Sequence, residues 1–499
     1  MLEEFFSALW NDIFHHCRHG NTDDVDEEDH DGGDNTLSGP FYITRNHNND
    51  AIPRRKNKNQ KSTRKCDKQR CMSAPLHPFQ SFSHLCDRIE RDDPNLTLVE
   101  FRGEFLNVRR LARALANNHH IVEFNLIQSI RDRETRDSRP RSAPTHDLLH
   151  LCLEGLQHNT AIEKLDLTET TIRASGAAFV SQGLQHHPQL QRLRLGRCLL
   201  QDEGLRRLAA APLGIRLEEL DLCGNNLSDG TALLQLLQQN PHLKKLDISN
   251  NAFTNKGLEQ FLSCGGFRAL QVCDLSCNNI RRGVALSLGK ALADPACQLK
   301  ELYLDANEMI NCSVESIALG LASNVSLEKL SLNGNDLCDV SAVKIAAAMG
   351  TNPNIRIREL LMSGNKIRET GANAIMKHAC ESMTKLDLSR NQICDGRIIC
   401  RILRSENTTI RKLSLSRNPI PLQQAHEVEL WTRLNNAGGR QLLSITGEKQ
   451  KGGDAMAVWP KILGRVSSHP NGVYYFLTRK PELFQAVSSM EGIRGESCS

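Results

Sequence analysis

Aromatic side chains are scarce in this 499-residue chain, where phenylalanine, tyrosine and tryptophan together make up 4% of the residues. Long hydrophobic runs are absent, so no membrane span is predicted. The 17 cysteines include no CxxC pair, which favours reduced, packed thiols over a disulfide framework. Charge of one sign is not in excess either: 62 basic and 58 acidic residues leave a formal net charge of +4. A dedicated nucleic-acid-binding protein is therefore not expected.

Catalytic and phosphate-binding motifs are also missing. The chain has no GxxxxGK[ST] loop, no HExxH or GxSxG motif and no set of protein-kinase motifs. We therefore expect a protein that is not an enzyme and uses no cofactor and no small-molecule substrate. One group of cysteines and histidines allows two interpretations, a zinc site or chance scatter in a linker. Its spacing is looser than in zinc modules and favours scatter, so no metal ligand is predicted among Cys66, Cys71, His77, His84 and Cys86.

One phrase, LxxLxLxxNxL, recurs along most of the chain. LEELDLCGNNL at 217–227 is a complete copy. From residue 162 onward, successive copies start 26 to 30 residues apart, a period typical of one supersecondary unit stacked on its neighbours. Complete and degenerate copies together give twelve frames, which start at residues 96, 121, 162, 190, 217, 243, 270, 299, 327, 357, 383 and 410.

Each frame predicts a short strand, a turn and a helix. Leu220 and Leu222 alternate with polar residues, which is the period of a strand with one buried face. The asparagine at the ninth position can bond backbone groups that the bend leaves unpaired. A glycine five or six residues further on, such as Gly230, often begins a helical segment. In every unit the strand is followed by a helix that leads to the next strand in the same direction. The frames therefore predict a curved α/β solenoid with a parallel sheet on the concave side and helices on the convex side.

These residues resemble the ribonuclease-inhibitor-like class of leucine-rich repeat proteins, and the resemblance covers 96–420. Seven frames keep asparagine at the ninth position, even before Asn418 is counted: Asn225, Asn251, Asn278, Asn307, Asn335, Asn365 and Asn391. Early frames depart from the pattern, so their turns are expected to be bonded differently. The ninth position there holds Glu104, Ser129, Thr170 and Cys198.

Composition divides the chain into five expected segments. The linker carries eight acidic residues in 23–34 and nine basic residues in 54–70, which favours an extended, disordered chain. Bulky, atypical residues suit the open ends of a solenoid, and most aromatic residues lie outside the array. We expect an amphipathic helix at 1–16, a disordered charged linker at 17–74, an N-terminal cap at 75–95, the repeat array at 96–420 and a helical C-terminal cap and tail at 421–499.

The segments ahead of the array leave two alternatives each. The apolar stripe of the helix at 1–16 requires a surface, which is either the array of the same chain or a partner. Within the linker, 54–65 resembles a bipartite nuclear-import signal or is a solvated connection.

Glu3 and Glu4 stand where a signal or mitochondrial peptide would be basic. We expect a cytoplasmic protein, with the nucleus as the alternative.

The concave surface is the remaining candidate for function. The third, fifth, seventh and eighth positions face it because they alternate with the buried fourth and sixth. Three aspartates at the fifth position are expected in a row at the sheet's spacing of about 4.8 Å, beside three arginines of one repeat. Such a pattern selects a partner by charge, or the aspartates serve only solubility. The candidate partner-binding residues are Asp166, Arg192, Arg194, Arg197, Asp221, Asp247, Asp274, Tyr303, Asp387, Arg131 and Arg133.

The arginine-dense stretch RDRETRDSRPR at 131–141 lies in an insertion of about 13 residues between the frames at 121 and 162. Insertions in solenoids map to loops, often at a binding rim. Resemblance to the activators of the Ran GTPase would make Arg131 or Arg133 a catalytic arginine. However, Thr170 and Cys198 stand where those proteins need an asparagine, and interleaved acidic residues favour a mobile rim loop.

The sequence therefore predicts a monomeric, non-enzymatic scaffold or regulator that binds a protein partner through its concave face and rim, with no specific nucleic-acid partner. A GTPase-activating protein for a Ran-like small GTPase is the alternative. The recognition arm of an innate-immune sensor is disfavoured, because no nucleotide-binding motif occurs in the sequence.

Overall fold

The computed structural model describes residues 82–102, 107–127, 147, 149–253, 255–280, 282–307, 309, 311–379 and 381–436. All of them belong to one compact unit. They hold the predicted repeat array, with one helix before its first strand and one after its last. The predicted helix at 1–16, the linker at 17–74, the loop at 131–141 and the tail beyond 436 lie outside the described residues.

Twelve short parallel strands form a single sheet, and their order in space is their order in the sequence. Each strand begins at the third position of its frame, so the prediction of one strand per frame is confirmed. The strands are β1 (Leu98–Arg102), β2 (Glu123–Ile127), β3 (Lys164–Asp166), β4 (Arg192–Arg194), β5 (Glu219–Asp221), β6 (Lys245–Asp247), β7 (Val272–Asp274), β8 (Glu301–Tyr303), β9 (Lys329–Ser331), β10 (Glu359–Leu361), β11 (Lys385–Asp387) and β12 (Lys412–Ser414).

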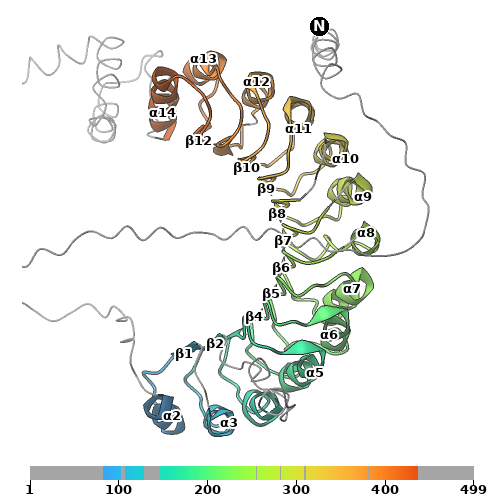
Figure 1. Ribbon diagram of the computed structural model, residues 1–499, viewed down its shortest axis with the longest axis vertical. Helices are drawn as coiled ribbons and strands as arrows, with labels where there is room; N and C mark the ends of the chain where they lie inside the picture. Colours follow the sequence, from blue (N-terminus) through green and yellow to red (C-terminus); the bar gives the residue numbers. More distant parts are fainter. Residues whose placement is uncertain are drawn as a thin grey trace, which may run out of the picture. The chain divides into compact units, whose positions relative to one another are not determined.

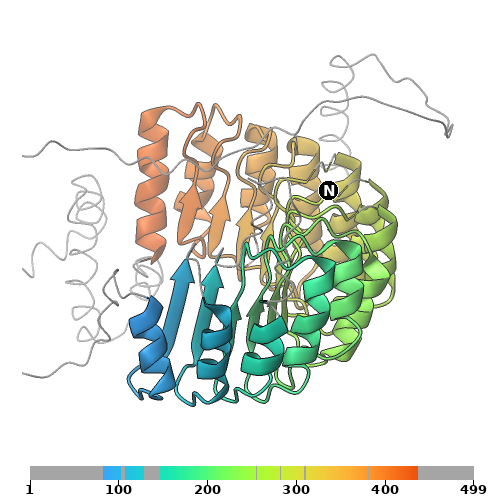
Figure 2. The same ribbon diagram turned by 60° about the horizontal axis from the view of Figure 1, so that its bottom comes forward.

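Helices follow the strands and lie on the outer side of the curved sheet, while the strands line its inner side (Figures 1 and 2). The predicted concave sheet and convex helical layer are thus confirmed. In the described ranges, no helix combines the length and apolar character that a bilayer crossing requires. The helices are α2 (Phe82–Glu90), α3 (Val108–Ala116), the π-helix η2 (His150–Leu156), α5 (Arg173–Leu184), α6 (Gln201–Leu208), α7 (Gly230–Gln239), α8 (Asn255–Ser263), α9 (Arg282–Ala293), α10 (Asn311–Leu321), α11 (Asp339–Thr351), α12 (Glu369–Lys377), α13 (Arg397–Ser405) and α14 (Leu422–Asn436).

The fourth and sixth positions of the frames fill the space between sheet and helices. In the frame at 217, Leu220 is 2% exposed and Leu222 is fully buried. Equivalent side chains of neighbouring repeats continue this packing as one hydrophobic cluster from α2 to α14. At the N-terminal end, the ring of Phe82 in α2 lies 5.5 Å from that of Phe101 in β1. An aromatic pair thus covers the first strand, as the cap requires.

Glycines near the helix starts have a role other than the predicted one. We expected a glycine often to begin the helical segment, which holds for Gly230 at the start of α7, but Gly176 and Gly204 are the fourth residues of α5 and α6, and Gly257 is the third of α8. A Cβ atom on Gly230, the first residue of α7, would lie 1.7 Å from the carbonyl oxygen of Gly257. Glycine is therefore needed because the first turns of adjacent helices approach each other closely.

The ninth-position asparagines form a hydrogen-bonded ladder that joins each repeat to the one before it. The Nδ2 of Asn365 donates to the carbonyl oxygens of Leu332 and Met362, both at 3.0 Å. Its Oδ1 accepts from the backbone N–H groups of Asn335 and Leu337, both at 3.0 Å. The predicted bonding of the turns is thus confirmed, and the same set of bonds recurs at Asn225, Asn251 and Asn307.

The early frames replace this ladder with weaker substitutes. Thr170 is fully buried and donates one hydrogen bond, from Oγ1 to the carbonyl oxygen of Leu126 at 2.9 Å. The buried thiol of Cys198 donates to the carbonyl oxygen of Leu167 at 3.1 Å. The expectation of differently bonded turns is therefore confirmed for these two frames.

A second set of asparagines stands three residues before the frames and bonds the ends of the helices. The Nδ2 of Asn159 donates to the carbonyl oxygens of Leu115, at 2.7 Å, and Asn118, at 2.9 Å. His187 occupies the corresponding position ahead of the frame at 190. Its side chain is 3% exposed, and neither ring nitrogen has a hydrogen-bond partner among the described residues. Burial disfavours the charged ring and lowers the pKa of His187 to about 4.

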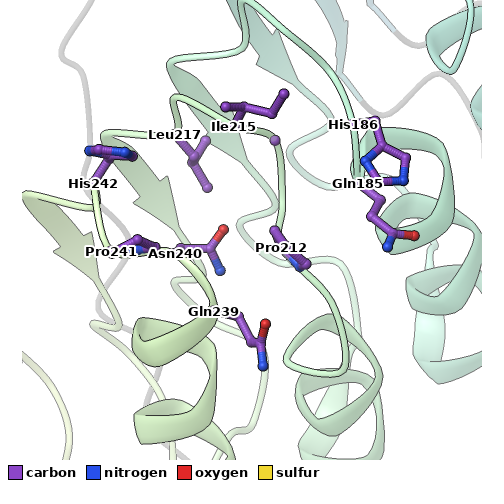
Figure 3. A pocket seen from close by; sticks show the side chains of 10 residues that line it. Gln185, His186, Pro212, Ile215, Leu217, Gln239, Asn240, Pro241 and His242 are labelled. Atoms are coloured by element: carbon purple, nitrogen blue, oxygen red, sulfur yellow. The ribbon is translucent and has the colours of Figure 1, made fainter.

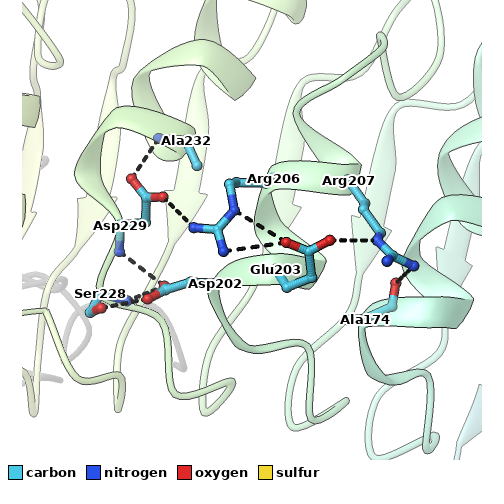
Figure 4. Close-up of polar contacts among 8 residues, drawn as sticks. All are labelled: Ala174, Asp202, Glu203, Arg206, Arg207, Ser228, Asp229 and Ala232. Atoms are coloured by element: carbon cyan, nitrogen blue, oxygen red, sulfur yellow. Dashed lines mark hydrogen bonds and ion pairs between the residues drawn. The ribbon is translucent and has the colours of Figure 1, made fainter.

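An ionic network centred on α6 joins this helix to the first turn of α5 and to the residue before α7 (Figure 4). Arg206 pairs with Glu203 of its own helix, at 3.3 Å, and with Asp229 immediately before α7, at 2.8 Å. Arg207 pairs with Glu203 at 2.9 Å and donates to the carbonyl oxygen of Ala174 in α5 at 3.3 Å. Adjacent helices are thus linked by side chains as well as by packing.

Asp202, in the first turn of α6, caps the following repeat. Its carboxylate accepts from the backbone N–H of Ser228 at 2.6 Å, from that of Asp229 at 3.0 Å and from the Ser228 hydroxyl at 2.6 Å. We expect Asp202→Ala to lower the free energy of unfolding by about 1 to 3 kcal/mol, the usual cost of leaving backbone N–H groups without their hydrogen-bond acceptor. Asp202→Asn keeps an acceptor oxygen and is expected to lose much less. Urea unfolding followed by circular dichroism tests this, and equal losses in both variants would contradict it.

Candidate functional site

The third positions of the strands form one row of side chains across the concave face, the position-three row. Most of its members are charged and their signs largely alternate, so that neighbours neutralise one another. This row was not predicted. Its ion pairs join Lys164 to Glu123, Arg192 to Glu219, Lys245 to Glu219, Lys329 to Glu301 and to Glu359, and Lys385 to Glu359.

The three arginines of the frame at 190 lie where predicted, but each is paired with a carboxylate of an adjacent repeat. The pairs are Arg192 with Glu219 at 2.5 Å, Arg194 with Asp166 at 3.4 Å and Arg197 with Glu169 at 3.1 Å. Asp166 is only 9% exposed. The predicted positive spot is therefore largely neutralised by its own neighbours, since adjacent parallel strands bring these long side chains within reach of acids.

The predicted row of aspartates, Asp221, Asp247 and Asp274, is confirmed and is called the aspartate row below. Strand register places Asp221 beside Asp247 and Asp247 beside Asp274. In each, Oδ1 accepts a 2.9 Å hydrogen bond from the backbone N–H two residues further on. The aspartates thus stabilise the turns after β5, β6 and β7. None of the three forms an ion pair within the described part of the chain.

Burial and mutual repulsion act on the aspartate row. Burial raises the pKa of Asp221, and the negative charge of Asp247 raises it further. Burial also raises the pKa of Asp274, with a smaller contribution from Asp247. Asp221 and Asp274 therefore lie in an environment that disfavours their charge.

The aspartate row lies in a hollow of about 310 Å³ on the concave face. Tyr303, the next member of the fifth-position row, lies at its edge. Its hydroxyl donates to Glu301 at 2.6 Å, and the Nζ of Lys329 lies 4.7 Å from the centre of its ring. Six of the predicted partner-binding residues thus converge on one hollow: Arg192, Arg194, Asp221, Asp247, Asp274 and Tyr303.

The residues that come nearest to a metal site are Asp221, Cys223 and Asp247, whose ligand atoms lie within 4.8 Å of one another. Sequence reasoning did not single out Cys223, which stands at a seventh position. Burial, followed by the charge of Asp221, raises the pKa of the Cys223 thiol. A protonated thiol is a poor metal ligand, and acidic groups at this spacing are common without a metal. These three residues therefore do not carry the assignment of a metal site.

Asp387 does not join the aspartate row, because β11 lies four strands away from β7. Its Oδ1 accepts from the Ser389 hydroxyl at 2.6 Å. Between the two sites, Asp305 accepts from the Ser331 hydroxyl at 2.5 Å and from the backbone N–H of Asn333 at 2.8 Å. On the concave surface of β8 to β11, Asp305 and Asp387 thus accept from hydroxyl and backbone amide donors, whereas Glu301 and Glu359 pair with lysines.

A second hollow, of about 250 Å³, was not predicted (Figure 3). It lies where α5 and α7 end and opens beside the irregular segment between α6 and β5. His186 and His242 stand on opposite sides of it, and Ile215 between them is 57% exposed. The hollow exists because α6 is short. In the sequence, the irregular segment APLGIR that follows α6 is the feature that could have indicated it.

Arg131 and Arg133 lie outside the described residues, so their role stays a prediction. The positions where an activator of the Ran GTPase would need an asparagine are described. Thr170 and Cys198 at these positions are both fully buried. Neither side chain is placed to orient a nucleotide or a water molecule on the surface.

Comparisons with known proteins agree with the repeat. A family model described as "Leucine Rich repeat" matches residues 239–262 and 379–396. Ribonuclease inhibitor of Sus scrofa is 28% identical over 311 residues, covering 60% of this chain and 67% of the inhibitor. NACHT, LRR and PYD domains-containing protein 14 of Homo sapiens is 27% identical over 334 residues, covering 61% of this chain and 30% of that protein.

Among solved structures, an internalin from Listeria monocytogenes is similar over 69% of this chain and 86% of its own, with a TM-score of 0.36 and 17% identity. The chain spans about two thirds of the porcine inhibitor and less than one third of the human relative. The recurring frame, the twelve-stranded parallel sheet and the likeness to ribonuclease inhibitors agree. The chain is a leucine-rich repeat protein of the ribonuclease-inhibitor-like class.

Proposed function

We propose that the protein is a non-enzymatic scaffold or regulator that binds another protein through the concave face of its repeat array. The observation that carries the proposal is the hollow over β5 to β7, on which six predicted contact residues converge. The likeness to a ribonuclease inhibitor, named for its action on another protein, supports the same role.

The rigidity of the concave face supports this proposal. The asparagine ladder fixes each strand against the one before it, and the position-three row links neighbouring strands by ion pairs. A surface held in one shape loses little conformational entropy when a partner binds. Its self-neutralised charges also disfavour non-specific attraction of charged molecules.

The chemistry of the cysteines supports binding over catalysis. Burial raises the pKa of the Cys152 thiol to about 12, and it raises that of Cys400 to about 12 as well. Protonated thiols are not nucleophiles. The described cysteines form no disulfide, which favours a reducing compartment. We propose that the protein acts as a monomer in the cytoplasm or nucleus.

A pair of arginine substitutions tests the concave face. Val272 in β7 and Leu361 in β10 are half-buried concave residues with apolar side chains. We expect the full chain carrying Val272→Arg and Leu361→Arg to lose at least tenfold in affinity for proteins captured from a cell extract, because long charged side chains obstruct the surface. Quantitative capture against the unmodified chain measures the loss.

The matched control places the same two substitutions on the convex side. Leu286 in α9 is 52% exposed and Leu319 in α10 is 69% exposed, so Leu286→Arg with Leu319→Arg adds the same charge away from the sheet. Capture by this control is expected to equal that of the unmodified chain. If only the convex variant loses its partners, or if both retain them, the concave face is not the binding site.

The GTPase-activating alternative receives no support from the described residues, because Thr170 and Cys198 are buried where an exposed asparagine is required. We therefore retain the binding role alone.

A further inference from the structure

We propose that residues 442–444 of this chain dock on the outer edge of β12 and add a thirteenth parallel strand to the sheet. The occupant of that edge is then the chain itself, and neither a second copy nor a partner. Three features carry the proposal: the spacing of the frame, the surface of the last described repeat, and one buried side-chain atom at the end of α14.

The spacing of the frame continues past the last described repeat. A further frame starts at Arg440, 30 residues after the frame at 410, and the steps from 162 onward run from 26 to 30. Leu443 and Ile445 then take the fourth and sixth positions, with the alternation of a strand that has one buried face. This copy is degenerate at its first position and at its ninth, Glu448, as the early frames are at the ninth.

The outer surface of the last described repeat is incompletely covered. Leu386 and Leu388, at the fourth and sixth positions of the frame at 383, are fully buried. Their equivalents Leu413 and Leu415, in the frame at 410, are only partly buried. Within the described ranges, no strand pairs with the outer edge of β12, which ends the row of strands (Figure 1). The array thus ends in partly exposed leucines and an open sheet edge, both of which require a cover.

The backbone beside β12 indicates what kind of cover this is. The N–H group of Leu388 donates to the carbonyl oxygen of Ser414 in the next repeat at 2.9 Å. The N–H group of Leu415 stands at the same position one repeat later, and the described residues offer it no acceptor. In a frame that starts at 440, the carbonyl oxygen of Ser444 takes the place of the missing acceptor. A strand of the same type therefore completes the hydrogen bonds of the edge.

The side chain of Asn435, at the end of α14, also lacks one partner. Its Nδ2 donates to the carbonyl oxygens of Asn407, at 3.2 Å, and Ile410, at 3.0 Å. Its Oδ1 is buried and has no hydrogen-bond partner in the described part of the chain. Asn352 stands five residues before the frame at 357, as Asn435 does before 440, and its Oδ1 accepts from the N–H group of Asn354 at 3.0 Å. A turn into a frame at 440 supplies the same donor, and a buried acceptor requires one.

A strand at 442–444 differs from the helical cap that we expected over the whole of 421–499. Helix α14 becomes the helix of the twelfth repeat, and the cap begins after the thirteenth strand. The proposed function does not depend on how the array ends, because the hollow over β5 to β7 lies at its middle. Loss of the strand would therefore leave capture of partners through that hollow unchanged.

A disulfide between neighbouring fifth positions tests the strand on the full chain. Strand register sets Asp387 beside Ser414, so the next strand is expected to set Ser414 beside Ser444. Parallel neighbours lie about 4.8 Å apart, within the Cα separation of about 4.4 to 6.8 Å that a disulfide spans. We expect S414C/S444C, oxidised with diamide, to form at least tenfold more cross-link between its two new cysteines than the control does. Mass spectrometry of the peptides identifies the linked pair, and gel electrophoresis shows that the link lies within one chain.

The control variant is S414C/T446C. Thr446 lies on the same face of the proposed strand but two residues further along, so its Cα lies about 8 Å from that of residue 414, beyond the reach of a disulfide. Equal cross-linking in both variants would indicate a segment without fixed register, and the inference is then wrong. It is also wrong if neither variant cross-links, or if the 414–444 link joins two chains, because a second copy then occupies the edge.

Hydrogen exchange supplies a second readout that needs no new cysteine. Leu443→Asn sets a polar side chain against Leu413 and Leu415, so we expect amide exchange over 412–417 to become at least tenfold faster as the strand detaches. Leu442→Asn makes the same change one residue earlier, on the concave face, and is expected to leave this exchange within twofold of the unmodified chain. Equal acceleration in both variants contradicts the alternation of a strand, and unchanged exchange in both contradicts the burial of Leu443.

Discussion

Replacing Asn365 with alanine is expected to lower the free energy of unfolding by about 4 kcal/mol or more, since buried polar groups without partners cost about 1 to 3 kcal/mol each. The substitution removes the Nδ2 donor of the Leu332 carbonyl and the Oδ1 acceptor of the Asn335 and Leu337 N–H groups. Asn365 is only 6% exposed, so water has little access to replace them. Urea unfolding of the full chain, followed by circular dichroism, measures the loss.

Thr170→Val is the matched comparison, because Thr170 stands at the same ninth position but donates a single hydrogen bond, to the Leu126 carbonyl. Valine has nearly the same shape, so the expected loss is about 1 kcal/mol. Similar losses for Asn365→Ala and Thr170→Val would show that the ladder contributes no more than one ordinary hydrogen bond.

Acidification is expected to destabilise the array through His187. The pKa of this buried ring is lowered from 6.5 to about 4, so the unfolded chain takes up a proton at a higher pH than the folded chain does. Stability is therefore complete above pH 6.5 and is lost as the pH falls from 6.5 towards 4. A shift of this size corresponds to roughly 3 kcal/mol. Melting temperatures measured between pH 7 and pH 4 follow the loss.

The variant His187→Asn is expected to remove that acid-dependent loss, because asparagine does not titrate and occupies the equivalent position at Asn118 and Asn159. It should also supply an amide donor like the one that Asn159 offers to the Leu115 carbonyl. His186→Asn, at the exposed neighbouring histidine, is the control and should retain the dependence of the unmodified chain. If His187→Asn retains it too, other groups control acid unfolding.

The strands and the aspartate row could be predicted from the sequence because both depend on the frame alone. A fixed frame places Leu220 in the core and sets Asp221 beside Asp247, whatever the curvature of the array. The bonding role of the ninth-position asparagines was predictable for the same reason. The position of a residue within the frame is thus enough to determine its place in the sheet.

Features that depend on distances between repeats were not predictable in this way. Gly230 starts α7 as expected, but the need for glycine at this position comes from the nearby Gly257 carbonyl of the next helix, which the frame alone does not indicate. Arg194 was expected to present its charge to a partner, but Asp166 lies within reach on the adjacent strand. The isolation of His187 in the core depends on which neighbouring groups face its ring. None of these facts follows from the spacing of residues within one frame.

The position-three row has a consequence for how this array could change in length. Its signs alternate from Glu301 through Lys329 and Glu359 to Lys385. Removal of the repeat of Lys329 or of Glu359 alone would bring two like charges side by side, whereas removal of both would set Glu301 beside Lys385, which are opposite in charge. Within this stretch, loss of the two inner repeats together therefore preserves the electrostatic match between neighbouring strands, whereas loss of either one alone disrupts it.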